Sequence, residues 1–392
     1  MEQDKLWNSE YIKVWCSNFL LYFAFMLMTP LLPLYLTDTF AANKEVIGVV
    51  LSGYALSALL MRPFSGYMVD TWSRKVVLLA MYFLTSALFG GYLLAGSLTM
   101  FAVFRILQGA PFGAAGVSIS TVMIDVLPPS RRAEGIGFFG LSNNVATAIA
   151  PGIGLLLYSR FQSYELLFVL SMVCSLIGLL VNATLHLRRR EPITEKKAIS
   201  LDRFFLLKGW ALFLVVLTLS FAYGILSTYV AIYGREQLGI TTGTGLFFTL
   251  FAVGLIVSRL TGTHSLREGK IVRNASMGIV VSISGFVLFT VVHQTWAYYL
   301  APLIIGLGNG HLWPACQTMF INLAEHNQRG TANSTLLTAW DLGMAVGMFV
   351  GGSVTEHFGY GHAFRTGVIL YAIGVVFYFV YARKHFELNR LR

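Results

Sequence analysis

The feature that most constrains this sequence is a series of apolar runs, each about 18 to 25 residues long, along the whole chain. About 20 apolar residues in a helix cross the hydrocarbon core of a bilayer. The runs do not alternate with a period of two residues, which argues against a β-barrel. Only 12% of the 392 residues are charged, against about 25% in soluble domains. We therefore expect an all-α integral membrane protein.

Twelve of these runs are predicted to be transmembrane helices. A polar segment divides them into an N-terminal half at 1–187, a linker at 188–208 and a C-terminal half at 209–392. The polar start of the chain leads into a full-length run, so we expect no cleaved signal peptide. The predicted spans are 12–36, 45–69, 76–95, 99–123, 135–157, 164–187, 209–233, 244–262, 274–293, 297–321, 333–355 and 364–382.

The basic residues predict the orientation of these spans. Most of the 28 Lys and Arg fall in segments on the same side as both termini, and seven of them lie between positions 188 and 208. The opposite side receives only Lys44, Arg160, Arg235 and Arg365. By the positive-inside rule both termini are cytoplasmic, and we expect an inner (plasma) membrane location. Since topology accounts for the formal charge of +10, we expect no nucleic-acid partner.

The two halves resemble each other at an offset close to half the chain length. GYMVDTWSRK at 66–75 and GTHSLREGK at 262–270 both follow an even-numbered span. Small residues also recur at one spacing in both halves, as Ala146, Ala150 and Gly154 and as Gly343, Gly347 and Gly351. A parallel repeat of this kind is typical of transporters that bind substrate near the membrane midplane.

Together these features resemble the major facilitator superfamily, and within it the twelve-span, proton-coupled drug and metabolite efflux antiporters. The superfamily's loop pattern Gly-x-x-x-Asp-Arg-x-Gly-Arg-Lys is matched by Gly66, Asp70, Arg74 and Lys75, but not by Thr71 or Ser73. The resemblance implies a major facilitator fold of two six-helix halves, with a proton gradient in place of a cofactor. It also implies that Asp70 pairs with basic residues of the other half as a conformational switch. A loop that only sets topology is the alternative.

Three ionisable residues within spans are candidates for proton coupling. Asp341 is the acid that lies well within a span, where a carboxylate costs several kcal/mol unless it is paired or protonated. Arg105 begins an Arg-x-x-Gln-Gly sequence, and the resemblance implies assistance to proton transfer. It could also hold a substrate carboxylate. His311 is the third candidate, because an unperturbed histidine side chain changes its charge near neutral pH. The alternatives are a fixed ion pair for Asp341, a hydrogen-bond hub for Arg105 and a buried packing residue for His311.

The resemblance places the substrate cavity along the first, fourth, seventh and tenth spans. Gly308 and Gly310 are expected to open room there, and the set suits an amphipathic or weakly anionic organic molecule. It lacks the clustered carboxylates or thiols of a metal site. The candidate substrate-binding residues are Asn18, Tyr22, Phe25, Arg105, Gln108, Tyr223, Tyr229, Asn309, His311, Trp313 and Gln317.

The fifth span partly matches the glycine-rich signature of proton-coupled exporters. Gly137, Pro151 and Gly154 match it, while Ala146 and Ala150 replace two of its glycines. Ordinary close packing of small residues is the alternative. We expect a monomeric multidrug-type efflux antiporter rather than an enzyme. An uptake symporter or facilitator for a sugar or metabolite is the second reading, and a non-transporting membrane receptor or enzyme is a remote third.

Overall fold

The computed structural model describes residues 5–128, 131–187, 205–240, 244–267, 270–324 and 329–391, and these ranges contain helices but no strand. They form two compact units. The first contains residues 1–40 and 53–197, and the second contains 41–52 and 198–392. A short segment from the N-terminal part of the sequence therefore packs with the C-terminal part. Most of the predicted linker, from 188 to 204, lies outside the described residues.

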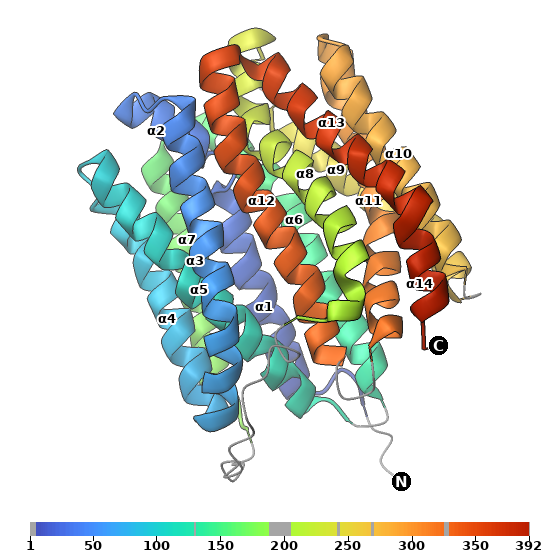
Figure 1. The fold of residues 1–392 in the computed structure, drawn as a ribbon. Coiled ribbons are helices and arrows are strands. Elements are labelled where there is room, and N and C mark those ends of the chain that lie inside the picture. Colours follow the sequence, from blue (N-terminus) through green and yellow to red (C-terminus); the bar gives the residue numbers. More distant parts are fainter. Residues whose placement is uncertain are drawn as a thin grey trace. The chain divides into compact units, whose positions relative to one another are not determined.

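Helices make up nearly all of the first unit (Figure 1). Several start at side-chain caps: Asn8, Ser97 and Ser163 each accept a hydrogen bond from the backbone N–H three residues later. The helices are α1 (Ser9–Met28), α2 (Leu32–Phe40), α3 (Lys44–Thr71), α4 (Arg74–Leu93), α5 (Leu98–Val126), α6 (Arg132–Phe161) and α7 (Tyr164–Ala183).

After residues 41–52, the described part of the second unit continues with a single 3-10 turn, η3 (Leu207–Gly209). It ends in a π-helical stretch, η5 (Tyr378–Ala382), followed by a short helix. The first turns of α3 belong to this unit. Its other helices are α8 (Trp210–Gln237), α9 (Gly245–Arg267), α10 (Ile271–Val291), α11 (Thr295–Leu323), α12 (Arg329–Phe358), α13 (Tyr360–Phe377) and α14 (Arg383–Asn389).

The two units repeat one pattern of helix pairing. In the first unit, α1 packs against α6 and α7, and α4 packs against α5 and α7. In the second unit, α8 packs against α12 and α13, and α10 packs against α11 and α13. The predicted sequence repeat thus has a counterpart in the contacts inside each unit.

The first predicted span, 12–36, is not one continuous helix. The chain leaves the α-helix after Met28 and starts again at Leu32 as α2. Pro30 has no N–H to donate, and the N–H of Leu31 bonds to the carbonyl of Met28 at 2.9 Å in a tight turn. A run of apolar residues predicted the length of this segment but not its break.

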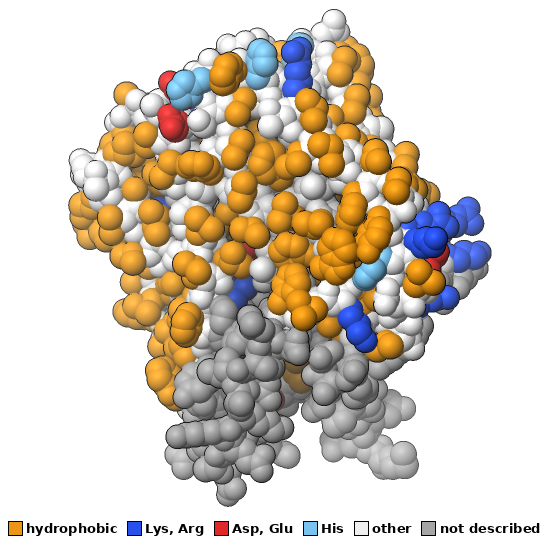
Figure 2. All heavy atoms as spheres, viewed as in Figure 1, with side chains coloured by type: hydrophobic (Ala, Val, Ile, Leu, Met, Phe, Trp, Pro, Cys, Tyr) orange, Lys and Arg blue, Asp and Glu red, His pale blue; other side chains and the backbone are white. Residues whose placement is uncertain are grey.

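The described exterior is that of a membrane protein. Large apolar side chains such as Leu60, Leu180 and Val380 are more than 60% exposed, and hydrophobic side chains dominate the described part of the face in Figure 2. Among the described residues, ten helices are long and apolar enough to cross a membrane, while the apolar part of α9 is shorter, at Gly245–Ser258. The count of twelve spans and the cytoplasmic position of both termini stay predictions.

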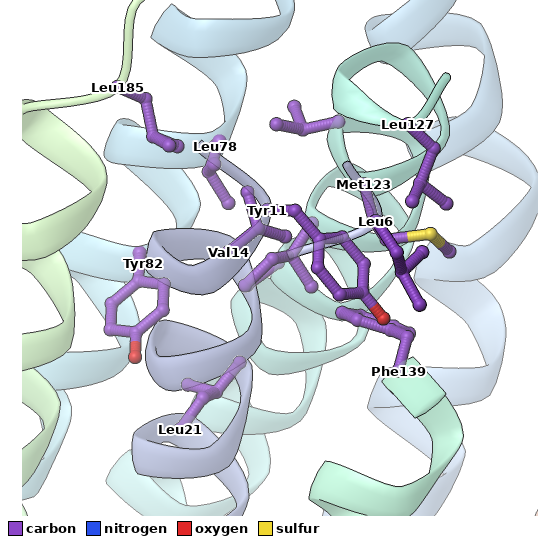
Figure 3. Close-up of a cluster of buried hydrophobic side chains, with 13 residues drawn as sticks. Leu6, Tyr11, Val14, Leu21, Leu78, Tyr82, Met123, Leu127, Phe139 and Leu185 are labelled. Carbon is purple, nitrogen blue, oxygen red and sulfur yellow. The ribbon is translucent and has the colours of Figure 1, made fainter. Parts of the chain in front are cut away.

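A cluster of buried side chains holds one end of the first unit together (Figure 3). Two tyrosines of this cluster have buried rings, and the hydroxyl group of each still donates a hydrogen bond. Tyr11 donates to the carbonyl of Gly135 at 2.6 Å, and Tyr82 donates to the carbonyl of Ser17 at 2.7 Å. Each bond joins α1 to another helix, so the cluster fixes the positions of α4 and α6 around α1.

Candidate functional site

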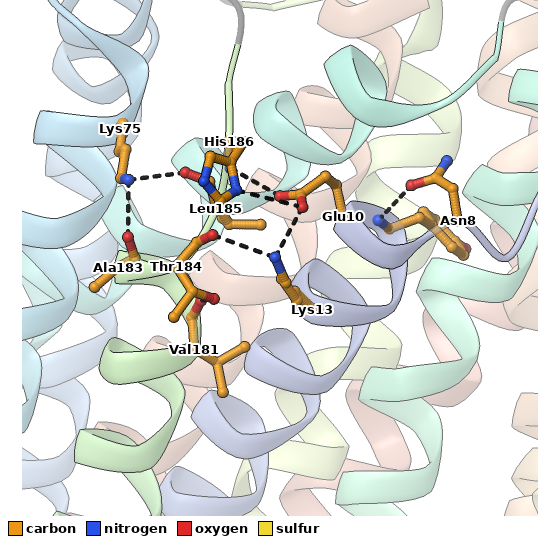
Figure 4. A network of polar contacts seen from close by, with 10 residues as sticks. Asn8, Glu10, Lys13, Lys75, Val181, Ala183, Thr184, Leu185 and His186 are labelled. Atoms are coloured by element: carbon orange, nitrogen blue, oxygen red, sulfur yellow. Dashed lines mark hydrogen bonds and ion pairs between the residues drawn. The ribbon is translucent and has the colours of Figure 1, made fainter.

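The cationic residues of the loop motif bind within the first unit. Arg74, the first residue of α4, forms an ion pair with Asp125 near the end of α5. Lys75 donates to the carbonyls of Ala183 and Leu185, each at 2.8 Å, at the end of α7 (Figure 4). The side chains of Gly66 and Asp70 lie outside the described residues, so pairing of Asp70 with the other half stays a prediction.

A second set of polar contacts surrounds the same end of α7 (Figure 4). Glu10 accepts the backbone N–H of His186 at 2.8 Å and the ammonium of Lys13 at 2.8 Å. Lys13 also donates to the carbonyl of Thr184 at 3.2 Å. Lysines at a helix C-terminus complement its partial negative charge. Lys13 of α1 and Lys75 of α4 therefore both hold the end of α7.

Arg105 lies in the first unit among aromatic rings. Its guanidinium is 4.1 Å from the ring centroid of Tyr54 and 5.1 Å from that of Phe25. The side chain is 3% exposed, and its Nη1 donates to the Tyr92 hydroxyl at 3.3 Å and to Gln108 Oε1 at 3.2 Å. A guanidinium buried this deeply is costly unless its charge is compensated. Electron-rich ring faces supply part of that compensation.

The predicted residues on the first and fourth spans are partly brought together. Phe25 stacks on Tyr54 and packs against Phe112, whose ring also contacts Tyr22 at 5.5 Å. Gln108 is fully buried and donates to the carbonyl of Thr85 at 3.3 Å. The structure thus brings Tyr22 and Phe25 onto Phe112, and Phe25 onto Arg105, which also bonds to Gln108.

Asn18 lies elsewhere, between α1 and α6. It is 1% exposed and donates to Ser142 Oγ at 2.7 Å and to Asn143. These bonds occupy its amide in helix packing, and its role in substrate binding stays a prediction.

Sequence reasoning missed Tyr54 and Tyr92. Both lie on helices that the resemblance did not assign to the cavity, although Tyr54 is the ring closest to the Arg105 guanidinium. A search of every span for aromatic residues able to face a buried arginine would have included them.

Gly308 and Gly310 do not open room in the second unit. A Cβ at Gly308 would overlap Ser282 of α10, and one at Gly310 would overlap the hydroxyl of Ser258 of α9. The expectation of a cavity at these glycines is therefore wrong. They instead allow α11 to approach both neighbouring helices closely.

Asn309 and His311 face α10. Asn309 Oδ1 accepts the Ser282 hydroxyl at 2.9 Å, and His311 Nδ1 lies 3.0 Å from Asn274 Oδ1. Both side chains are 6% exposed. The position of His311 matches its alternative reading as a buried, hydrogen-bonded residue, while its role in proton coupling stays a prediction.

Replacing Asn274 with Ala is expected to destabilise the second unit, because His311 then loses a buried hydrogen-bond partner. The expected cost is about 1–3 kcal/mol, seen as a lower thermal unfolding midpoint of purified protein. Ser284→Ala, which removes an exposed hydroxyl from the same helix, should leave the midpoint almost unchanged. Equal midpoints for the two variants would contradict a stabilising role for the pair.

A second aromatic group includes Trp340, the residue before Asp341 in α12. Tyr223 contacts Phe251 at 5.4 Å and Trp340 at 5.5 Å, and Trp340 contacts Trp313 at 5.1 Å between ring centroids. Asp341 follows Trp340 in α12 and is partly exposed, as is Gln317 in α11. The structure thus joins two predicted residues, Tyr223 and Trp313, through Trp340, which the sequence analysis did not select.

Tyr229 of α8 contacts the first turns of α3 and is not part of that aromatic group. Its ring is fully buried, and its hydroxyl donates to the carbonyls of Met348 at 3.0 Å and Lys44 at 3.2 Å. Lys44 also donates through its backbone N–H to Glu356 at 2.7 Å and through its ammonium to Glu236 at 3.3 Å. These contacts fasten the start of α3 to α8 and α12.

Tyr229→Phe is expected to lower stability by about 1 kcal/mol, because two partly buried carbonyls lose a donor. Substrate affinity should stay unchanged, since the hydroxyl is occupied by backbone. The thermal midpoint and the dissociation constant of a transported solute, measured on one preparation, separate the two effects. A weaker affinity at an unchanged midpoint would instead support the predicted substrate role.

The small-residue motif acts in helix packing. A Cβ at Gly154 of α6 would overlap the carbonyl oxygen of Leu27 in α1, next to the break before α2. In the second unit, Gly347 of α12 comes equally close to the carbonyl of Phe221 in α8. Pro151 lies inside α6, and the surroundings of Gly137 lie outside the described residues. Close approach of these helix pairs requires glycine at such positions.

No group of three or more His, Cys, Asp or Glu within the described ranges could hold a metal ion. The polar groups described in the two units are suited to hydrogen bonding and to charge recognition.

A family model described as Major Facilitator Superfamily matches residues 14–310 and 269–390. The quinolone resistance protein NorA of Staphylococcus aureus (strain COL) is 20% identical over 362 residues, covering 89% of this chain and 90% of that protein. The tetracycline resistance protein, class G, of Vibrio anguillarum is 26% identical over 334 residues, covering 82% and 84%.

Solved structures share the fold at low sequence identity. The nucleoside transporter NupG gives a TM-score of 0.72 at 16% identity, covering 96% of this chain and 99% of that one. The peptide transporter POT in complex with sulfate gives a TM-score of 0.78 at 14% identity, covering 97% and 96%. At such identities the likeness supports the fold and leaves the substrate open.

Proposed function

Because this chain belongs to the Major Facilitator Superfamily, we propose that it is a proton antiporter that exports a small amphipathic organic molecule by alternating access. The family and the structural neighbours are transporters rather than enzymes, and the chain is a multi-pass plasma-membrane protein. The observation that carries export is the similarity to two drug-resistance proteins over most of the chain.

The composition of the two aromatic groups supports an amphipathic substrate. Tyr54 and Phe25 pack on Arg105 in the first unit, and Tyr223, Trp340 and Trp313 form an aromatic group in the second. Such rings bind large apolar surfaces, and their hydroxyl and indole groups hydrogen-bond to polar atoms. Asp341 is proposed to carry the proton, because it is an ionisable group within an apolar helix.

Proteoliposomes that enclose a pH-sensitive dye test this function. A quinolone and a tetracycline, chosen from the names of the relatives, should each drive proton movement opposite to their own movement. Movement of proton and solute in the same direction, with a nucleoside or a dipeptide as the active solute, would support uptake instead. Solute movement without proton flux would overturn coupling and favour a facilitator.

A further inference from the structure

We propose that Arg105 is an anion subsite, and that the transported molecules carry a carboxylate or a similar planar anionic group next to an aromatic body. This inference rests on the proposed transport function and names the class of its substrate. It assigns to Arg105 a direct contact with the ligand, in place of a part in proton transfer.

The free edge of the guanidinium is the first observation. Both hydrogen bonds of Arg105 come from Nη1, and the Nε atom is buried without a hydrogen-bond partner. A carboxylate binds arginine side-on with two parallel hydrogen bonds, from Nε and Nη2. The bonds to Tyr92 and Gln108 therefore occupy Nη1. They leave Nε, on the edge that a carboxylate binds, without a hydrogen-bond partner.

The charge balance is the second observation. No carboxylate of a described residue pairs with Arg105, and its hydrogen-bond acceptors are a neutral phenol and a neutral amide. A cation that is 3% exposed gains most from a counter-ion, because water cannot solvate it fully. Two other basic residues of this unit have acidic partners, Arg74 in Asp125 and Lys13 in Glu10.

The rings explain why the ligand also needs an aromatic or flat apolar body. Tyr54 and Phe25 cover the guanidinium, and Phe25 and Phe112 are themselves half-buried. We expect Phe25, which is half-buried, to rotate away when a ligand binds, while Tyr54 stays on the cation. A ligand ring can then pack on Phe112 and Tyr22 while its anionic group reaches Arg105.

The test compares 2-naphthoate with 2-naphthamide, which share a ring system and differ in charge. Their dissociation constants are measured by calorimetry on purified full-length protein. The wild type should bind the acid about tenfold or more tightly than the amide. Arg105→Gln should bring the ratio close to one by weakening the acid alone. Arg365→Gln, at an exposed position of α13, should keep the wild-type ratio.

Equal or weaker binding of the acid by the wild type, including no measurable binding, would overturn the subsite. A wild-type ratio in Arg105→Gln would do the same. If Arg105→Gln fails to fold, Arg105→Lys is measured instead. Lys keeps the positive charge but lacks the two parallel N–H donors of the guanidinium, so the acid-to-amide ratio of affinities should fall several-fold.

Proton flux in liposomes separates this inference from the proposed function. A wild type that prefers the acid but couples no solute to protons would refute antiport and support the subsite. Loss of proton flux in Arg105→Gln with an unchanged acid-to-amide ratio would assign Arg105 to coupling and overturn the subsite.

Discussion

Asp341→Asn is expected to reduce solute-driven proton movement to the level of protein-free liposomes. Asn has nearly the same size as Asp but cannot take up and release a proton at this site. The side chain is partly exposed within α12, and the proposal is that a proton reaches it there. Binding of the solute should survive, because the aromatic group of Tyr223, Trp313 and Trp340 remains in place.

Asp38→Asn is the matched control for this prediction. Asp38 accepts a hydrogen bond from the Tyr164 hydroxyl at 2.6 Å and lies in α2, so its carboxylate also has polar neighbours. The proposal assigns no proton to it, and proton movement should persist in that variant. Solute-driven proton flux in Asp341→Asn at the wild-type rate would refute Asp341 as the carrier. Loss of flux in both variants would indicate a general effect of removing a carboxylate.

The helices could be predicted from the sequence because the length of an apolar run and the polar residues that end it are local properties of the chain. The ends of α8 and α10, for example, fall within a few residues of the predicted spans. The break after Met28 escaped that reasoning, since Pro30 and Pro33 occur inside an unbroken apolar run. Hydropathy is insensitive to a missing backbone donor.

The surroundings of the candidate residues could be predicted only in part. Arg105 and Asp341 were found because a charge within an apolar run is costly wherever it lies. The glycines around Asn309 were misread, because sequence spacing does not reveal that Ser258 and Ser282 fill the space beside them. Tyr54 and Trp340 were missed for a related reason, as their contacts come from other helices.

Gly154→Ala is expected to destabilise the first unit strongly. The added Cβ would overlap the Leu27 carbonyl oxygen, and backbone cannot rotate away as a side chain can. Overpacking of this kind costs about 1–3 kcal/mol or more. The thermal midpoint and the yield of monodisperse protein should both fall relative to the wild type.

Gly140→Ala in the same helix is the control, because a Cβ at Gly140 meets nothing within 4 Å. Ala is the better helix former by about 1 kcal/mol, so this variant should match or exceed the wild-type midpoint. The pair distinguishes the two readings of the small-residue motif. If Gly154→Ala unfolds early while Gly140→Ala does not, the glycine acts through contact between α1 and α6. If Gly154→Ala keeps the wild-type midpoint but leaks protons without solute, the contact serves coupling, and close packing alone does not explain the motif.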